Sequence, residues 1–177
     1  MNPPKEIRQI LFSADQIRQR VQVLGKQISD DYQQAEPLIL IGILKGSFYF
    51  LADLSRTITH PVEIEFMSIS SYGSDTVSSG NVKILKDLDR DISGRDVLLV
   101  EDILDTGLTL DYLLRSLEAR NPKSLKVCTL LDKPERRQVS VPVAYRGFEI
   151  PDAFVVGYGL DYDQMYRNLP YIGVLEP

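Results

Sequence analysis

A group of carboxylates directly follows an apolar run near the middle of the chain, in the stretch VLLVEDILDTGLTL at residues 97–110. Glu101, Asp102 and Asp105 repel one another and resist removal from water, so something must compensate their charge. Ionised carboxylates accept hydrogen bonds and cannot donate them, so the adjacent Glu101 and Asp102 suit the vicinal hydroxyls of a sugar or a hydrated Mg²⁺. The alternative is that both acids are simply solvated.

The second half of this stretch, DTGLT, has the composition of a phosphate receptor. Thr106 and Thr109 supply hydroxyls, Gly107 can adopt positive φ, and a helix that begins here offers unpaired N–H groups. The alternative is that Asp105 and Thr106 only cap the following helix. A site for sugar hydroxyls beside a site for phosphate indicates that the ligand contains a ribose 5-phosphate.

Two other motifs share some of these letters and fit less well, and two further nucleotide-binding motifs are excluded. Aspartic proteases carry Asp-Thr-Gly, but they need two facing loops in an all-β fold, and this chain has one such loop in an α/β pattern. Aspartyl-phosphate enzymes place a second acid two residues after the first, whereas Asp102 and Asp105 are three apart. No GxxxxGK[ST] occurs, and Gly157-Tyr158-Gly159 lacks the strand-to-helix context of a dinucleotide site.

The elements around these residues follow an alternating pattern of strands and helices. Continuous apolar runs at 38–44, 96–100 and 125–131 predict buried strands, and 62–70 alternates with period two. Helices are predicted from Ala14, after a capping box of Ser13 with Gln16, across 48–58, and across 109–120, where Asn121-Pro122 stops the last one. The order implies parallel βαβ units in a three-layer α/β domain.

In such sheets ligands bind at the carboxyl ends of the strands, where loops lead into helices. Two loops are predicted there: LKGSF after residues 38–44, and EDILDTGLT after residues 97–100. The chemistry of the carboxylates and hydroxyls is therefore expected at the ligand-binding edge of the sheet.

Composition limits the classes of protein that the chain can be. Its 177 residues are 44% hydrophobic and predict one domain over 1–177, while 20 basic against 25 acidic residues argue against a nucleic-acid or anionic-membrane surface. The single Cys128 lies in an apolar run and predicts a buried thiol in a reducing compartment. The N-terminus is charged and no apolar run approaches the ~20 residues of a membrane span, so we expect a cytoplasmic protein. His60, before Pro61, is expected in a turn.

Beyond these patterns, residues 97–110 closely resemble the phosphoribosyl diphosphate signature of the type I phosphoribosyltransferases. The rest of the chain resembles the hypoxanthine-guanine branch of that family, through LKGS at 44–47, SSYGS at 70–74, LLDKPERR at 130–137 and IPDAFVVGYGLDYDQMYRNLPYIGVL at 150–175. The resemblance implies a three-layer fold with a mainly parallel central sheet, helices on both faces and a small hood from the terminal segments. Ser47 departs from the pattern, because many relatives have a second glycine there.

The resemblance also implies a reaction of purine salvage. In this family N9 of a purine displaces pyrophosphate from C1 of 5-phosphoribosyl 1-diphosphate, with Mg²⁺ required. The products with hypoxanthine and guanine are IMP and GMP. Since relatives are commonly dimers or tetramers, the resemblance implies a homodimer or homotetramer, with no nucleic-acid or membrane partner.

Matching positions carry the family's roles for the activated sugar. Glu101 and Asp102 match residues that hold the ribose hydroxyls and the nearby metal, and Asp161 matches a ligand of a second Mg²⁺. Arg167 matches an arginine that clamps pyrophosphate. The remaining contacts match two loops, which are Lys45 and Gly46 for the pyrophosphate and Asp105, Thr106, Gly107, Leu108 and Thr109 for the 5-phosphate.

Further matches describe the purine site. Lys133 matches the lysine that donates to the 6-oxo group, a donor that adenine's 6-amino group could not accept. Phe154 matches a ring that stacks on the purine, although its position alone favours core packing, and Val155 matches a residue whose main chain reads the base edge. Asp105 matches the acid near N7, a general acid or base. The matching loop at 70–80 closes over the site through Ser71 and Tyr72.

Two functions from other classes compete with transfer to a 6-oxopurine. A regulator could keep the phosphoribosyl diphosphate fold and bind nucleic acid, but the net charge of −5 and the presence of Lys133 and Phe154 argue against it. An aspartyl-phosphate phosphatase would release phosphate from a phosphomonoester without any base. The sequence leaves open how well guanine and xanthine are used beside hypoxanthine.

Overall fold

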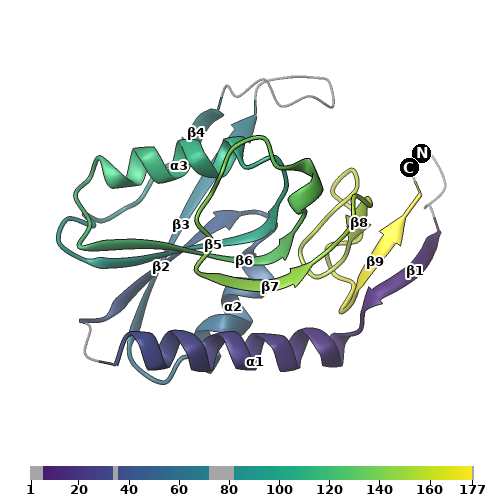
Figure 1. Cartoon of the computed structure of the whole chain (residues 1–177), viewed down its shortest axis with the longest axis horizontal. Helices are drawn as coiled ribbons and strands as arrows, with labels where there is room; N and C mark the ends of the chain where they lie inside the picture. The colour runs from purple at the N-terminus through teal and green to yellow at the C-terminus, as the bar shows by residue number, and fades with distance from the viewer. Residues whose placement is uncertain (1–5, 34–35, 72–81, 177) are drawn as a thin grey trace.

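A six-stranded, mainly parallel sheet forms the centre of the molecule in the computed structural model, which describes residues 6–33, 36–71 and 82–176 (Figure 1). Its strand order is β4-β3-β2-β5-β6-β7. Only β3 and β4 run antiparallel to each other. The bounds of the strands are β2 Leu38–Leu44, β3 Val62–Ser71, β4 Val82–Lys86, β5 Asp96–Leu104, β6 Ser124–Asp132 and β7 Tyr145–Glu149.

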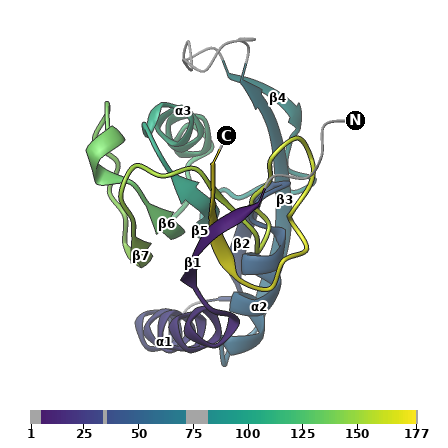
Figure 2. The same ribbon diagram turned by 90° about the vertical axis from the view of Figure 1, so that its right-hand side faces the viewer.

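Helices cover both faces of this sheet and confirm the predicted three-layer arrangement. Helices α1 (Ala14–Asp31) and α2 (Phe48–Thr57) lie on one face and α3 (Leu108–Glu118) lies on the other (Figure 2). Alternate residues of β2 enter two separate cores: Leu38 and Leu40 pack on the side of α1 and α2, and Ile39 and Ile41 on the side of α3. A strand buried on both faces needs this continuous apolar sequence.

The start of α1 shows why the local sequence forms a helix there. The Ser13 hydroxyl accepts from the Gln16 backbone N–H at 3.3 Å, and the Gln16 side chain accepts from the Ser13 N–H at 2.8 Å. This is the predicted capping box, and it satisfies two N–H groups of the first turn. Four apolar residues then face the sheet, namely Ile17, Val21, Leu24 and Ile28.

A second, smaller sheet joins the two ends of the chain, as the predicted hood requires. Its order is β1-β9-β8, from β1 (Ile7–Phe12), β9 (Ile172–Leu175) and β8 (Val155–Val156). Both neighbouring pairs are antiparallel. Figure 1 shows this sheet beside one end of the central sheet, where β1 from the start of the chain pairs with β9 near its end.

One boundary differs from the prediction in a way that matters for the site. The buried run was expected to end at Val100, but β5 continues to Leu104, because its ladder with β6 continues from Glu101 opposite Thr129 to Leu104 opposite Asp132. Glu101 and Asp102 therefore lie on a strand and not in a loop. Their backbones are fixed by the sheet.

Three smaller expectations also have outcomes. Cys128 is buried, as predicted, and His60 lies in a bend between α2 and β3. No helix among the described residues is both long enough and apolar enough to span a membrane.

Candidate active site

The predicted site residues gather at the carboxyl ends of β2, β5 and β6, where two cavities lie next to each other. The smaller, of about 120 Å³, is lined by residues 101, 103–107, 109 and 110. The larger, of about 440 Å³, is lined by Asp102, Ile103, Asp105, Lys133, Arg136, Phe154, Val155, Leu160 and Asp161. The predicted phosphate loop thus lines one cavity and the predicted purine residues line the other, while Asp105 borders both.

The acidic pair on β5 has little compensation from the protein. Glu101 Oε2 is buried and has no hydrogen-bond partner among the described residues. Burial, reinforced by the neighbouring Asp102, raises the pKa of Glu101 well above its ordinary value. Burial also raises the pKa of Asp102 to about 6, despite the Ile103 N–H that donates to Oδ1 at 2.8 Å and the nearby guanidinium of Arg167. Such a pair favours a cation or hydroxyl donors beside it.

The predicted phosphate loop forms a tight turn at the start of α3. Gly107 has φ 86° as the N-cap residue, and it has no side chain with which to cap the helix. A Cβ at this glycine would lie 2.9 Å from the carbonyl oxygen of Val139. The Thr106 hydroxyl accepts from the Leu108 backbone N–H at 3.4 Å, whereas Asp105 pairs with Arg136. The alternative that both residues only cap the helix thus fits Thr106 in part and not Asp105, and the start of α3 lines the smaller cavity through Gly107, Thr109 and Leu110.

A buried ion-pair cluster that the sequence reasoning missed holds this loop from behind. Asp132, at the end of β6, is 1% exposed and pairs with Arg137 and with Arg146, the latter at 2.7 Å. The Arg137 Nε donates to the backbone carbonyl of Asp105 at 3.0 Å. The signal was present in LLDKPERR, where an acid that ends a buried strand is followed by arginines, but the pairing became clear only once the strands were aligned.

The predicted purine cavity contains both the expected donor and the expected ring. Lys133 is 5% exposed, its Nζ lies 3.7 Å from Asp152 Oδ1, and its backbone N–H donates to Leu104 O at 2.9 Å. Phe154 is 42% exposed and meets Tyr162 edge-on, with 5.7 Å between the ring centroids. Phe154 is therefore not a core residue, contrary to what its position alone favours. Val155 is buried in β8.

The ion pair of Asp105 with Arg136 was also missed. Arg136 Nε contacts Asp105 Oδ1 at 3.0 Å, and a second guanidinium nitrogen of Arg136 lies 3.4 Å from Asp152. Arg136 lies in a short 3₁₀ helix, η1 (Pro134–Arg136), directly after the purine-site lysine. A partly exposed cation thus accompanies the proposed acid or base at the boundary of the two cavities.

The predicted pyrophosphate residues approach the acidic pair from the ends of β2 and β8. A Cβ on Gly46 would collide with the carboxylate of Asp102, so a larger residue at position 46 would require that carboxylate to move. The peptide between Leu44 and Lys45 is cis. Ser47, where the sequence departs from the family pattern, is buried, and its hydroxyl donates to the carbonyl of Ile43 at 2.7 Å.

The remaining two charged residues of the predicted set are paired with each other. An Arg167 guanidinium nitrogen lies 2.6 Å from Asp161, and another donates to the carbonyl of Gly159 at 2.7 Å. Lys45 and Arg167 both also reach the side-chain oxygen of Gln164, at 3.1 and 3.4 Å. Of these two cations, Arg167 acts on Asp102, where its charge lowers the pKa against the larger effect of burial.

The donor set partly fits the predicted Mg²⁺. Within 6–33, 36–71 and 82–176, no three Asp, Glu, His or Cys side chains form a metal-binding group, and Asp161 is paired with Arg167. The unpartnered Glu101 oxygen and the adjacent Asp102 carboxylate are hard oxygen ligands. They suit a cation that takes one or two carboxylates and completes its shell with water and substrate oxygens.

Two predicted residues cannot be placed. Ser71 is the last residue of β3, and its side chain is not described. Tyr72 and the rest of the predicted closing loop through Gly80 lie outside the described residues.

Comparisons with known proteins agree on one family. A family model for the phosphoribosyl transferase domain matches residues 10–163. The hypoxanthine-guanine phosphoribosyltransferase of Mycobacterium avium is 56% identical, over 98% of this chain and 88% of its own. The hypoxanthine phosphoribosyltransferase of Escherichia coli is 52% identical, over 96% of both chains. A crystal structure of a hypoxanthine-guanine phosphoribosyltransferase from Bacillus anthracis has a TM-score of 0.92 at 50% identity, over 97% of this chain and all of the other.

Proposed function

Because the chain belongs to the phosphoribosyltransferase family, we propose that its site transfers the 5-phosphoribosyl group of 5-phosphoribosyl 1-diphosphate to N9 of hypoxanthine or guanine. The products are IMP or GMP and pyrophosphate, and the reaction belongs to purine salvage. The observation that carries this function is the uncompensated pair Glu101 and Asp102, held on a strand between a cavity lined by the phosphate loop and a cavity that contains Lys133.

Lys133 sets the choice of base in this proposal. Its ammonium is almost fully buried, so a purine must present an acceptor to it, as the 6-oxo group of hypoxanthine and guanine does. Adenine would present an amino donor to a buried cation, which is costly because neither group would be satisfied. The exposed ring of Phe154 at the same cavity is free to cover one face of the base.

Asp105 exchanges the purine proton. Its carboxylate borders both cavities, so a purine in the larger cavity and a phosphoribosyl group in the smaller one would meet next to it. A general acid or base at this place contributes about 10²–10⁴-fold to the rate. Arg136 keeps the carboxylate oriented by its 3.0 Å contact.

The activated sugar is held by residues on both sides of β5. The first turn of α3 binds the 5-phosphate through N–H groups and the hydroxyls of Thr106 and Thr109, while Glu101 and Asp102 accept from the ribose hydroxyls. Lys45, Gly46 and Arg167 bind the departing pyrophosphate. Fixing both substrates in line lowers the barrier by orienting them, and cations aimed at the leaving group stabilise its developing charge.

Mg²⁺ belongs to this proposal as the cofactor. Glu101 and Asp102 would hold it, and Asp161 would do so only after separating from Arg167. When bound, the metal neutralises part of the charge of the pyrophosphate. The expected role of Ser71 and Tyr72 in covering the site stays a prediction.

The function is tested by mixing the protein with Mg²⁺ and phosphoribosyl diphosphate and adding hypoxanthine, guanine, xanthine or adenine in turn. Ultraviolet spectra and chromatography of the products show which nucleotide forms. Turnover with hypoxanthine and guanine and none with adenine is expected. If none of the four bases yields a nucleotide, the proposal is wrong.

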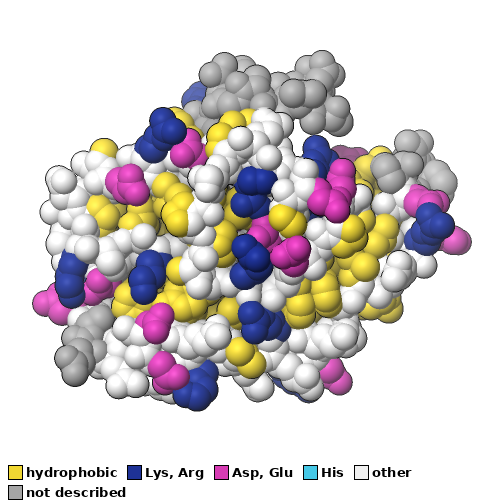
Figure 3. All heavy atoms as spheres, in the orientation of Figure 1, with side chains coloured by type: hydrophobic (Ala, Val, Ile, Leu, Met, Phe, Trp, Pro, Cys, Tyr) yellow, Lys and Arg dark blue, Asp and Glu magenta, His cyan; other side chains and the backbone are white. Residues whose placement is uncertain are grey.

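We also propose that residues 1–177 form one domain, and that the protein is a cytoplasmic homodimer or homotetramer. The family match over most of the chain and the buried thiol of Cys128 support the first two points. Acidic and basic side chains are interspersed on the face shown in Figure 3, which argues against nucleic acid as a partner there. Sedimentation equilibrium measures the assembly, and a monomer at micromolar concentration would contradict it.

A further inference from the structure

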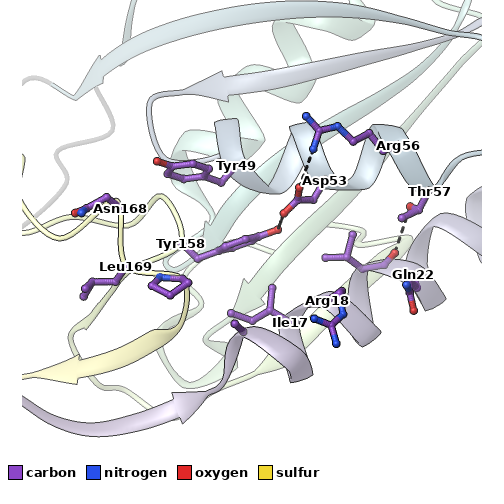
Figure 4. A pocket seen from close by; sticks show the side chains of 13 residues that line it. Ile17, Arg18, Gln22, Tyr49, Asp53, Arg56, Thr57, Tyr158, Asn168 and Leu169 are labelled. Carbon is purple, nitrogen blue, oxygen red and sulfur yellow. Dashed lines mark hydrogen bonds and ion pairs between the residues drawn. The ribbon is translucent and has the colours of Figure 1, made fainter.

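A third cavity lies away from the site, between α1, α2 and the segment around residues 158–170 (Figure 4). Its volume is about 460 Å³, which is within the range of small-molecule sites. None of its lining residues lines either cavity of the proposed active site. The cavity is therefore a separate feature that transfer to a purine does not use.

The walls of this cavity are mainly apolar and aromatic. Ile17 and Val21 come from α1, Tyr49 from α2, and Tyr158 and Leu169 from the C-terminal segment. The rings of Tyr49 and Tyr158 lie at an angle of 24° with 6.2 Å between their centroids. These walls favour a ligand with a flat or compact hydrocarbon body.

The charges at the rim favour an anion. Arg18 and Arg56 both line the cavity, and among the residues that the structure describes Asp53 is the one acid that does. Asp53 already accepts the Tyr158 hydroxyl at 2.7 Å, and Arg56 lies 3.6 Å from it. Arg18 pairs with Asp15, which is outside the lining. The Arg18 and Arg56 side chains are 64% and 78% exposed, so the guanidinium on either helix can pair with a carboxylate, sulfonate or phosphate of a ligand in the cavity.

One wall of the cavity is formed by Tyr158, whose neighbour Gly159 contacts the segment proposed to bind pyrophosphate. Tyr158 stands between Gly157 and Gly159, and a Cβ on Gly159 would collide with the carbonyl oxygen of Gly46. The carbonyl of Gly159 also accepts from Arg167 at 2.7 Å. A displacement of the Tyr158 side chain would therefore move backbone that touches Gly46 and Arg167 directly.

The second wall, helix α2, is also connected to the segment proposed to bind pyrophosphate. Helix α2 begins at Phe48, directly after Lys45 and Gly46, and it carries Tyr49 and Asp53 into the cavity. The hydrogen bond from Tyr158 to Asp53 joins the two walls. A ligand that wedges between them changes the spacing of the two segments that would hold pyrophosphate.

We propose that this cavity is a regulatory site for a small amphipathic anion, an apolar ring system with one acidic group, whose binding changes the affinity for phosphoribosyl diphosphate. The coupling rests on the proposed function, because it needs that substrate in the site. The binding itself does not, and the two are tested separately.

Binding is tested with two fluorescent probes of similar shape. The probe 8-anilinonaphthalene-1-sulfonate carries one negative charge, and N-phenyl-1-naphthylamine is its neutral counterpart. We expect the anionic probe to bind saturably and the double variant Arg18→Glu with Arg56→Glu to weaken it by about tenfold or more, equivalent to at least ~1.4 kcal/mol. The affinity of the neutral probe should change less than threefold in the same double variant. Lys26→Glu, an exposed charge reversal on α1 outside the cavity, is the matched control and should leave both affinities unchanged.

A variant that blocks the cavity tests whether the probes bind there and not elsewhere on the protein. Ala14→Trp places a large ring at the exposed start of α1, in the mouth of the cavity, and should weaken both probes. Failure of the anionic probe to bind wild type would overturn the proposal. So would binding that is unchanged in both the arginine double variant and Ala14→Trp, because the probe would then occupy another site.

Coupling is tested by calorimetric titration of phosphoribosyl diphosphate and Mg²⁺ with and without saturating anionic probe. We expect the dissociation constant to change at least threefold in wild type. In Tyr158→Phe, which removes the hydroxyl that joins the walls, the probe should still bind but the change should be smaller. The regulatory role would be overturned if the probe left the dissociation constant of phosphoribosyl diphosphate unchanged in wild type. It would also be overturned if the probe competed with phosphoribosyl diphosphate and this competition persisted in both the arginine double variant and Ala14→Trp. Absence of nucleotide formation with every base would instead contradict the proposed function and leave the probe result standing.

Discussion

Two neighbouring strands of the central sheet carry acids near their carboxyl ends, and the two strands differ in how far the protein compensates the charge of these acids. At the end of β6, Asp132 is paired with the guanidinium groups of Arg137 and Arg146. On β5, Glu101 has a buried oxygen without any hydrogen-bond partner, and the pKa of Asp102 is raised to about 6 by burial. Asp132 is compensated by two guanidinium groups, Asp102 only in part by the Ile103 N–H and the nearby Arg167, and the Glu101 oxygen by none of the described residues.

This difference separates a structural acid from acids kept for a ligand. A buried charge without a partner destabilises the folded state, so it persists where a bound molecule supplies the missing partner. Asp132 instead anchors Arg137, which holds the backbone of Asp105. The compensated acid positions the loop, and the uncompensated acids bind what the loop encloses.

The largest effect is expected from removing the compensated acid. Asp132→Asn leaves Arg137 buried without a carboxylate, and we expect the free energy of unfolding to fall by about 3 kcal/mol. Urea denaturation measures it. Glu149→Gln, which removes an exposed partner of Arg146 at 3.4 Å, is the control and should change stability by less than about 0.5 kcal/mol. Equal effects of the two substitutions would remove the distinction between buried and exposed pairs.

A change in the uncompensated pair should affect activity instead of stability. Asp102→Asn removes a charge whose burial costs more than the Ile103 N–H and Arg167 return, so we expect an unchanged or slightly higher free energy of unfolding. The kcat/KM for phosphoribosyl diphosphate should fall about 10²-fold, because an acceptor for the sugar and metal is lost. Steady-state kinetics and urea denaturation are measured on the same preparation. A loss of stability as large as that of Asp132→Asn would identify Asp102 as structural.

The pH dependence of stability sharpens the same comparison. The pKa of Asp102 rises from 3.8 to about 6 on folding, so the folded state holds its proton more tightly. This contribution to stability is fully present below pH 4 and is lost as the pH rises through 6. Relative to Asp102→Asn, wild type without ligand should lose on the order of 1 kcal/mol between pH 4 and 7, a figure reduced for partial exposure. A constant difference across this range would contradict the shift.

The smallest effect on stability is expected from the partly exposed ion pair of Arg136 with Asp105, which lies near both Asp132 and the acids of β5. Arg136→Ala removes the 3.0 Å contact with Asp105, but the two side chains are 41% and 39% exposed, so the free energy of unfolding should change by less than about 0.5 kcal/mol. The KM for hypoxanthine and the turnover should change more than stability does. A loss above about 1.5 kcal/mol would mean that this pair is as structural as that of Asp132.

The sequence predicted the parts of this architecture that depend on local patterns. Continuous apolar runs located β2, β5 and β6, and the Ser13 capping box located the start of α1. The composition of residues 101–109 located the ligand-binding edge of the sheet. These features depend on residues that are close in the chain, so periodicity and residue type are sufficient to find them.

Features that depend on distant pairing were not predictable in this way. The extension of β5 through Glu101 and Asp102 depends on its ladder with β6, and the terminal sheet pairs β1 with β9 across almost the whole chain. Arg146 reaches Asp132 only because β7 lies beside β6. The roles of Lys133 and Arg167 came from resemblance, since an isolated lysine or arginine is more often a surface charge.

The claim that Glu101 and Asp102 are left uncompensated for the activated sugar and its metal is tested most directly by calorimetric titration. Phosphoribosyl diphosphate is titrated into wild type and into Asp102→Asn, each with Mg²⁺ and with no divalent cation. We predict that Mg²⁺ tightens binding at least tenfold in wild type and much less in Asp102→Asn. Equal dependence on Mg²⁺ in both proteins would show that the ligand and its metal bind without these carboxylates, and would contradict the account.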